Sequence, residues 1–279
     1  MIDTHCHIHD CSCYNFALSR QQIGKKLLKN YPDYPHKPGD FTPEKIINRA
    51  HAAGVGKMIC IGTSHEDSMA ARDFATTHAS DGVYWTYGIH PDEAAESELK
   101  ISRDPKTLFV ADPTRPAPVA IGEVGLDYSR SEANRKNQIK LFERMLQLAK
   151  DNNLPVIFHI REAFDDFFAI IDNFPDVRGV VHSFSDNSKN LKKSLEKGFY
   201  IGVNGLATFA PELPTREIPL DKVLLETDAP FLTPTPFRGT VNEPAHVKEI
   251  CAYLSNITGE SEALVAEITT KNAKQLFQI

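Results

Sequence analysis

Short apolar segments alternate with longer amphipathic ones along the whole chain, and this alternation constrains the fold more than any other feature of the sequence. Eight strands are predicted, at residues 1–5, 57–62, 83–88, 119–124, 155–159, 179–182, 200–203 and 222–226. Most of them are continuous apolar runs, as expected for parallel strands that are buried on both faces.

Amphipathic helices are predicted between and after these strands, at residues 42–53, 64–78, 131–152, 162–174, 187–197, 243–254 and 261–277. Thr42 and Pro43 suit the N-cap and the first position of the first helix. Strand–helix repetition with eight strands predicts an α/β fold, the closed (β/α)8 or TIM barrel, for which 279 residues are an ordinary length. An open doubly wound sheet is the alternative, but the first predicted strand lacks a GxGxxG turn.

Three segments fall outside the repeating pattern. Residues 11–40 read as a loop insertion with a helix across 18–29, residues 104–118 hold four prolines, and residues 230–244 follow the last strand. Long loops in compact domains are often functional. We expect a single barrel domain over residues 1–279 with the insertion at 11–40.

Charge and cysteine content exclude some classes of protein. The net charge of −6, without a Lys/Arg-rich block, argues against a protein that wraps duplex nucleic acid. An enzyme acting at one strand end stays compatible with this charge, because bound metal ions add local positive charge. Five irregularly spaced cysteines, no signal-peptide pattern and no membrane-length apolar run predict a cytoplasmic protein with reduced thiols. We expect no membrane contact, and a monomer or weak oligomer.

Imidazole and carboxylate side chains stand at the predicted strand ends: His5, His7, His90, Glu123, His159, His182 and Asp228. Because all strand ends of a barrel open on one face, we expect these side chains to gather in one cup. His5 and His7 are two residues apart in an extended chain, so both can reach one ion. A single strand-end histidine is usually structural, but this joint pattern predicts a site for zinc or a related divalent ion.

The same residues suggest how such a site could work. Glu123 offers two oxygens and could bridge two metal ions. Asp228 could bind a metal ion or accept a proton from metal-bound water. Metal ions would lower the pKa of that water and yield a hydroxide nucleophile near neutral pH.

At these positions the chain resembles the TatD family of metal-dependent deoxyribonucleases, within the amidohydrolase-like barrel superfamily. The matching segments are IDTHCH at 2–7, GIHP at 88–91, IGEVGLDY at 121–128, PVIFHIREA at 155–163, HSFS at 182–185, LETDAP at 225–230, and the residues at 238–239 and 242–244. They follow the family's order from end to end. EVGLDY and ETDAP are specific to the family, whereas HxH is shared with other hydrolases.

The resemblance implies two divalent metal ions, Zn, Mn or Mg. One would be held by His5, His7, Glu123 and Asp228, and the other by Glu123, His159 and His182. Asp228 would also act as general base or proton shuttle. His90 and Arg161 would contact the substrate or its phosphate. Arg238 and Glu243 would also belong to the substrate-binding residues, because they would shape the loop that closes near the site.

The implied reaction is exonuclease-like hydrolysis of phosphodiesters by metal-activated water, at the end of single-stranded DNA or on a small phosphoester. Residues 11–40 exceed the family's usual first loop, and Ser183 stands where cysteine is frequent, so substrate choice is open. The alternatives are hydrolysis of a small-molecule ester, amide or lactone, and a binding protein without catalysis.

Several other polar residues are expected to be structural. A separate zinc site at Cys6, Cys11 and Cys13 is not favoured, because four ligands at finger spacing are not visible. Cys60 is expected to be a small buried residue. Asp127 is expected to stabilise the turn after the fourth strand, with a hydrogen bond near the site as the alternative. Surface or capping roles are expected for His36, His51, His65, His78 and His246.

Overall fold

Parallel strands in chain order form the centre of the molecule. The structure is a computed structural model of the 279-residue chain, and it describes residues 1–23, 25–94, 115–129 and 134–279. The eight predicted strands are all present, as β1 (Ile2–Cys6), β2 (Lys57–Cys60), β3 (Val83–Trp85), β4 (Ile121–Asp127), β5 (Val156–Arg161), β6 (Gly179–Val181), β7 (Tyr200–Val203) and β8 (Val223–Leu225). Regular ladders join them in two runs, β1-β2-β3 and β4-β5-β6-β7-β8.

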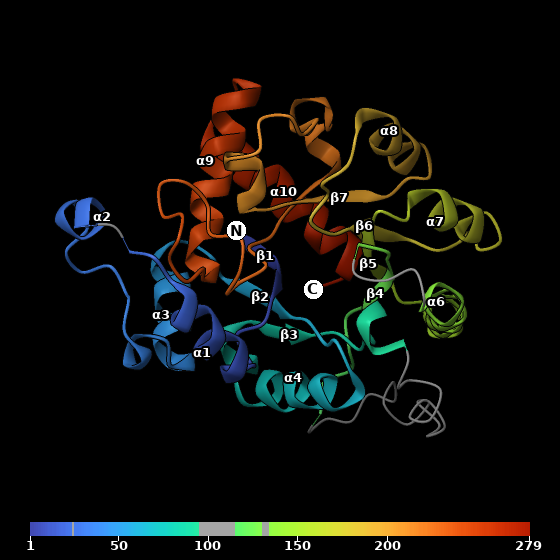
Figure 1. Cartoon of the computed structure of the whole chain (residues 1–279), viewed down its shortest axis with the longest axis horizontal. Helices are drawn as coiled ribbons and strands as arrows, with labels where there is room; N and C mark the ends of the chain where they lie inside the picture. The colour runs from blue at the N-terminus through green and yellow to red at the C-terminus, as the bar shows by residue number, and fades with distance from the viewer. Residues whose placement is uncertain (24, 95–114, 130–133) are drawn as a thin grey trace.

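Two seams join these runs into a ring. Between β3 and β4, Tyr87 N donates to Ala120 O at 3.2 Å and Gly122 N donates to Tyr87 O at 2.8 Å. Between β8 and β1, Asp228 N donates to His5 O at 2.8 Å. The predicted α/β barrel is confirmed (Figure 1).

A buried carboxyl group strengthens the seam between β1 and β8. Asp3 Oδ1 accepts from Thr227 N at 2.9 Å, and Asp3 Oδ2 accepts from Thr227 Oγ1 at 2.6 Å. Burial raises the pKa of Asp3 to about 8, although these hydrogen bonds act in the opposite direction. The first and last strands of the barrel are therefore tied by side chains as well as by backbone.

The helices that cover the barrel follow the predicted pattern, with ends displaced by a few residues. They are α3 (Pro43–Ala52), α4 (His65–Thr77), α6 (Arg135–Asp151), α7 (Phe164–Ile171), α8 (Ser188–Glu196), α9 (Val247–Thr258) and α10 (Glu262–Phe277). Thr42 and Pro43 occupy the N-cap and first position of α3, as predicted. None of the helices in the described ranges is long and apolar enough to span a membrane.

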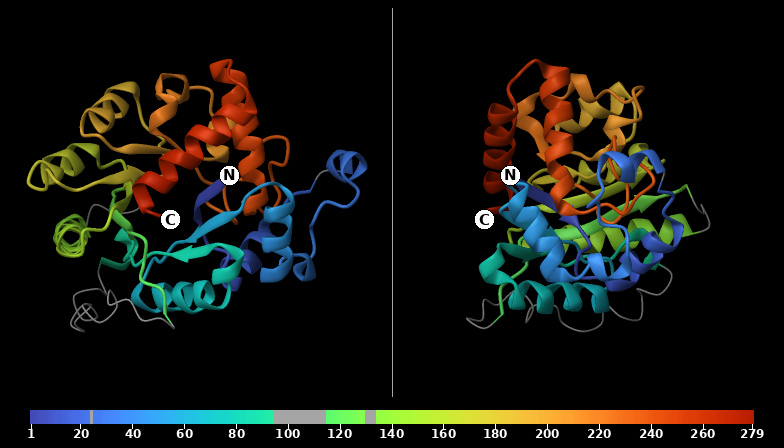
Figure 2. Two further views of the ribbon diagram at one scale, coloured as in Figure 1. Left: turned by 180° about the vertical axis from the view of Figure 1, so that it is seen from behind. Right: turned by 90° about the vertical axis from the view of Figure 1, so that its left-hand side faces the viewer.

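Two apolar cores lie on either side of the strands. The outer core packs buried side chains of the strands against the helices, as where Phe158 of β5 meets Phe142 of α6 and Phe167 of α7. The inner core fills the ring with Ile2, Ile59, Ile157, Val180, Leu224 and the α10 residues Ala273, Leu276 and Phe277. Figure 2 shows α10 lying across the end of the barrel where the strands begin.

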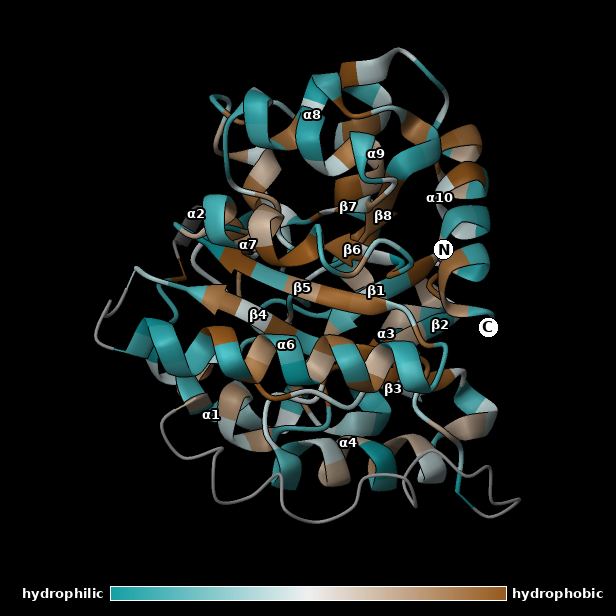
Figure 3. Cartoon of the chain, turned by 90° about the vertical axis from the view of Figure 1, so that its right-hand side faces the viewer, coloured by the Kyte–Doolittle hydropathy of each residue, from teal (hydrophilic) through white to brown (hydrophobic). Residues whose placement is uncertain are grey.

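Residues 11–40 contain two short helices at the opposite end of the barrel, toward which the strands point (Figure 3). They are α1 (Cys11–Arg20) and α2 (Lys25–Asn30). The predicted helix across 18–29 is therefore wrong. Helix α1 begins earlier because the Asp10 side chain accepts from Ser12 N and Cys13 N, and it ends where Gln21 becomes extended.

The other two predicted loops differ in what the structure shows of them. Residues 104–114 lie outside the described residues. Residues 230–243 contain turns but no helix or strand, as predicted, and a short 3₁₀ helix, η9 (Pro244–His246), follows them.

Candidate metal centre

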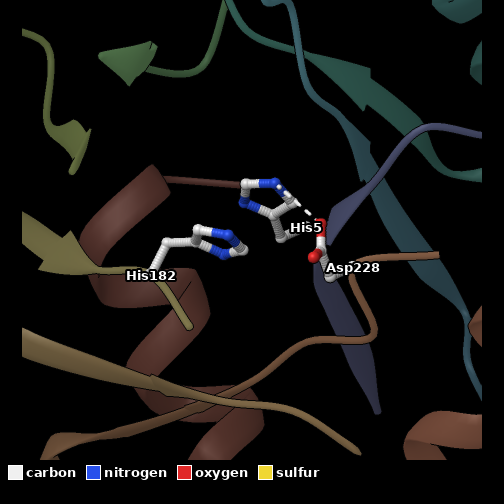
Figure 4. Close-up of side chains that lie close together, drawn as sticks. All are labelled: His5, His182 and Asp228. Atoms are coloured by element: carbon white, nitrogen blue, oxygen red, sulfur yellow. Dashed lines mark ion pairs between the residues drawn. The ribbon is translucent and has the colours of Figure 1, made fainter. Parts of the chain in front are cut away.

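Six strands, β1, β3, β4, β5, β6 and β8, bring the candidate ligands to one end of the barrel. Their ligand atoms form three overlapping groups, within each of which all atoms lie within 4.8 Å of one another. The groups are His5–His182–Asp228, His5–His7–Glu123 and His90–Glu123–His159. Figure 4 shows the first of them. The predicted convergence of these distant residues is thus present in the fold.

Glu123 lies at the centre of this cup. Its Oε2 is 3.5 Å from His5 Nε2, on the side of the first strand. Its Oε1 is 2.5 Å from His159 Nδ1 and 3.7 Å from His182 Nε2, on the other side. The two oxygens of one carboxylate therefore face two different sets of imidazoles, which is the arrangement that a bridging ligand requires.

Asp228 completes the side of the cup near β1. Its Oδ1 lies 3.6 Å from both His5 Nε2 and His7 Nε2. The backbone of Asp228 is left-handed, with φ of 57°, a conformation that costs a non-glycine residue about 1–3 kcal/mol. The hydrogen bond from Asp228 N to His5 O holds it there and aims the carboxylate at the two histidines.

The ring of His5 shows that the cup suits a cation. His5 is 0% exposed, and neither ring nitrogen has a hydrogen-bond partner within the part of the chain that the structure describes. Its ring stacks on His182 with centroids 3.5 Å apart (Figure 4). A buried polar group without a partner costs about 1–3 kcal/mol. A divalent ion would satisfy it, and the imidazole and carboxylate donors fit such an ion.

Charge within the cup keeps Glu123 ionised. Burial would raise the pKa of Glu123, but His159 and His182 beside it hold that pKa well below its ordinary value. Burial would likewise lower the pKa of His159, yet Glu123 raises it to about 9. Glu123 is therefore ionised at neutral pH and can offer a negatively charged oxygen to a metal ion.

Glu226 stands behind the cup and was not predicted. It is 1% exposed, and its Oε1 lies 3.0 Å from Nδ1 of His182. The same oxygen accepts from Ser183 N at 2.7 Å and from Asn204 Nδ2 at 3.3 Å. The sequence held one signal for it, since Glu226 precedes Asp228 by two residues and alternation places both on the same side of an extended chain.

The side chain of Asp127 has two contacts, which correspond to the two roles considered for it. Its Oδ1 accepts from Ser129 N at 2.9 Å and from Ser129 Oγ at 2.6 Å, so it stabilises the turn after β4. Its Oδ2 lies 3.2 Å from Nε2 of His159. Asp127 thus joins the turn to one of the candidate ligands.

Two residues expected to contact substrate lie at the cup. His90 Nε2 is 4.0 Å from Glu123 Oε1, and the His90 ring is 4.4 Å from that of His159. Burial lowers the pKa of His90 to about 4, so its imidazole is neutral. Arg161 is the exposed last residue of β5 and follows His159 by two residues, which places both on one face of the strand.

The other two expected substrate contacts lie in the segment after β8. The guanidinium carbon of Arg238 is 3.6 Å from the ring centroid of Phe209, and Arg238 Nη1 donates to Thr233 O at 3.2 Å. Glu243 is 3% exposed, and both of its carboxylate oxygens accept hydrogen bonds from Arg49 of α3. Glu243 therefore attaches this loop to α3.

His246 stands at the N-cap of α9, one of the two roles expected for it, but it does not lie at the surface. His246 is 6% exposed rather than superficial, because the chain after β8 folds back over it. Its Nδ1 lies 2.8 Å from Asn242 Oδ1, and its ring stacks on Phe237 at 5.0 Å. Cys60 is buried as expected, and Cys11 is exposed.

The chain matches known proteins over its whole length. The family model described as TatD related DNase matches residues 2–278. An uncharacterized metal-dependent hydrolase of Bacillus subtilis, YabD, is 34% identical over 86% of this chain and 94% of its own length. The protein named 3'-5' ssDNA/RNA exonuclease TatD of Citrobacter koseri is 33% identical over 85% of this chain and 93% of its own.

Solved structures agree with these matches. The crystal structure of YJJV, a TatD homolog from Escherichia coli K12, superposes with a TM-score of 0.79 and 28% identity, over 100% of this chain and 98% of that one. A hydrolase TatD family protein from Entamoeba histolytica gives a TM-score of 0.80 at 20% identity, over 99% and 97% of the two chains. The second likeness shows the shared fold.

Proposed function

Because this chain belongs to the TatD-related DNase family and is a metal-dependent hydrolase, we propose that its cup binds two divalent ions and hydrolyses phosphodiesters at the end of single-stranded DNA. The observation that carries the proposal is the position of Glu123, whose two oxygens face different imidazoles. A relative named as an exonuclease of single-stranded DNA and RNA supports the substrate class.

Each half of the cup would hold one ion. His5, His7 and Asp228 form the half near β1, and His159 and His182 form the other, with Glu123 between them. The donors fit zinc and manganese, and the carboxylates also fit magnesium. Divalent ions held there would act as Lewis acids toward the phosphate and would lower the pKa of a water molecule.

The residues of this chain would supply position and proton transfer. Asp228 Oδ1, fixed by its strained backbone, would accept the proton of the attacking water. Arg161 would grip the phosphate, because its guanidinium can bind two oxygens at once. The neutral imidazole of His90 would donate a hydrogen bond to the substrate. Arg238 and Glu243 would act through the loop after β8, Glu243 by holding it to α3.

Replacing Glu123 by alanine tests the proposal. We expect Glu123→Ala to lose both ions and to lower the rate of cleavage of labelled single-stranded DNA by at least about 100-fold, since it removes the shared ligand. Metal content is measured by mass spectrometry after loading with Zn²⁺, Mn²⁺ or Mg²⁺.

Glu267→Ala, an exposed change on α10, is the control and should keep both properties. Full activity and full metal content in Glu123→Ala would refute the assignment. Esters and lactones are assayed in parallel, and turnover of those compounds without cleavage of DNA would overturn the substrate class. Cleavage of DNA that survives Asp228→Ala would indicate a contaminating nuclease.

A further inference from the structure

Residues 11–40 lie beside the opening of the cup that the candidate metal ligands form, which is called the metal cup below. Helix α1 begins four residues after His7, and the two helices of the segment occupy the end of the barrel toward which the strands point (Figures 2 and 3). A substrate that enters the cup must pass this end of the molecule.

The segment differs in charge from the rest of the chain. It contains five basic side chains, Arg20, Lys25, Lys26, Lys29 and Lys37, and two acidic ones, Asp33 and Asp40, a net charge of +3. The whole chain carries −6, so all other residues together carry −9. The segment thus has the opposite net charge to the rest of the chain, and it adjoins a cup for which we propose a polyanionic substrate.

The segment also exposes aromatic side chains. Phe16 is 51% exposed and Tyr31 is 41% exposed, and within the described ranges the one other exposed large apolar side chain is Leu264, at 37%. The guanidinium carbon of Arg20 lies 4.6 Å from the Phe16 ring centroid. An aromatic face beside a cation on the outer side of α1 matches what nucleic-acid bases and phosphates require.

The surface is held in place by the loop after β8. Gln22 N donates to Gly239 O at 2.6 Å, and the Tyr31 ring meets Phe237 edge-on at 5.0 Å. The hydroxyl groups of Tyr34 and Thr240 are 2.7 Å apart, and both groups are buried. The aromatic and basic groups are therefore tied to the chain segment that follows Asp228.

We propose that residues 11–40 form an accessory surface that binds the single strand leading away from the cup. Phe16 would stack on a base, and Arg20 would pair with a phosphate. This inference rests on the proposed function, and it assigns the insertion to strand binding rather than to the reaction. Stacking and phosphate contacts of this kind suit single strands of any sequence, because every base presents an aromatic face.

Direct binding to fluorescein-labelled dT20 in chelator tests the surface without turnover. We expect Phe16→Ala to weaken binding by about five- to 150-fold at every salt concentration, the range for loss of one stacked base. Arg20→Ala should reduce the slope of log affinity against log salt by about 0.7, which corresponds to one lost phosphate contact.

The matched controls remove an exposed apolar side chain, Leu264, and an exposed basic side chain, Lys271, from α10. Leu264→Ala and Lys271→Ala should bind dT20 like the unchanged protein. Equal binding by Phe16→Ala, Arg20→Ala and the controls, with unchanged melting temperatures, would overturn the proposal. The proposal would also be overturned if binding to phosphatidylglycerol vesicles required Phe16 and Arg20 and binding to dT20 did not.

Kinetic measurements distinguish failure of the strand-binding proposal from failure of the proposed function. With dT20 as substrate, Phe16→Ala should raise KM at least about fivefold, whereas turnover of thymidine 5′-p-nitrophenyl phosphate, which has one base and one phosphodiester and so no second base to stack on Phe16, should stay unchanged. If neither phosphodiester is hydrolysed but dT20 binding needs Phe16, the proposed function fails and the surface stands. If both are hydrolysed and Phe16→Ala affects neither KM nor binding, the surface fails alone.

Discussion

Single side chains behind the metal cup determine how its imidazoles are oriented. Glu226 Oε1 lies 3.0 Å from Nδ1 of His182, within ion-pair distance, so a proton on this nitrogen would face the carboxylate. The other ring nitrogen, Nε2, then faces Glu123 at 3.7 Å as a free electron pair once the ring is neutral. A carboxylate in this position fixes the tautomer of a histidine ligand and raises its basicity.

Replacing Glu226 by glutamine tests this role. We expect Glu226→Gln to weaken metal binding by about 10- to 100-fold, because the amide holds the ring less firmly and carries no charge. Competition with a chromogenic chelator measures the affinity. Glu196→Gln at the end of α8 is the control. Unchanged affinity in Glu226→Gln would show that the carboxylate only fills space beside His182.

The convergence of the candidate ligands could be predicted from sequence because each stands where an apolar run ends, and the barrel fixes where strand ends lie. Glu226 could not be assigned in the same way. Its contact with His182 depends on how β6 and β8 lie across the intervening β7, which no local pattern records. His246 was misjudged for the same reason, since its burial comes from the loop that precedes it.

Among the elements, the segment between β8 and α9 depends on its attachment to α3. Glu243 accepts from Arg49 through both carboxylate oxygens, with distances of 2.5–2.9 Å. The Arg49 side chain is 29% exposed and that of Glu243 is 4% exposed, so the pair is largely shielded from water. Removing Arg49 would leave the buried carboxylate of Glu243 unpaired, whereas removing Glu243 would leave a guanidinium that is partly exposed to water.

We expect Glu243→Ala to lower the free energy of unfolding by about 1.5–3 kcal/mol, since it removes the charged hydrogen bonds from Arg49. Urea denaturation measures the loss. Glu267→Ala should change this free energy by less than about 0.5 kcal/mol. The double variant Arg49→Ala/Glu243→Ala should lose less than the sum of the two single changes, and strict additivity would contradict the pairing.

The same segment should make stability depend on pH through His246. Burial, and secondarily Arg49, lowers the pKa of His246 from 6.5 to about 3. Between these values the unfolded chain binds a proton that the folded chain does not, so stability falls as pH decreases from 6.5 toward 3.

Replacing His246 by asparagine removes the titrating group and keeps a polar partner for Asn242. We expect the free energy of unfolding to fall less steeply with decreasing pH in His246→Asn, by up to about 1.4 kcal/mol per pH unit. Urea titrations at pH 7, 6 and 5 measure the slopes. Parallel slopes for the two proteins would show that His246 is protonated in the folded state.

Strands and covering helices could be predicted because their apolar periodicity is strong. The helix expected at 18–29 was wrong because a capping side chain, Asp10, starts α1 well before that region. The sequence of α1 has little apolar periodicity, with Tyr14 as its one buried residue. Its boundaries therefore depended on capping, which the apolar pattern does not report.

For the molecule as a whole, closure of the ring rests on few bonds between β8 and β1. Thr227 Oγ1 donates to Asp3 Oδ2 at 2.6 Å and accepts from Ala229 N at 3.1 Å. Backbone bonds of Asp228 and His7 continue the seam into the cup. The presence of a ring could be predicted from eight repeats, but these closing contacts involve polar residues that strand patterns do not single out.

We expect Thr227→Val to lower the free energy of unfolding by about 1–3 kcal/mol, because it leaves a buried acceptor on Asp3 and the N–H of Ala229 without the hydroxyl. Thr227→Ser keeps the hydroxyl and should lose less. Thermal and urea unfolding measure both. If the valine variant were as stable as the parent, the hydroxyl would not contribute to closing the barrel.

Helix α10 has a consequence for the order in which the protein is made. Ala273, Leu276 and Phe277 share the inner core with Ile2 of the first strand. Residues separated by almost the full length of the chain must meet before that core excludes water, and such distant contacts slow folding. A nascent chain on the ribosome therefore cannot seal its interior until residue 277 has emerged, and earlier fragments would expose apolar strands to chaperones.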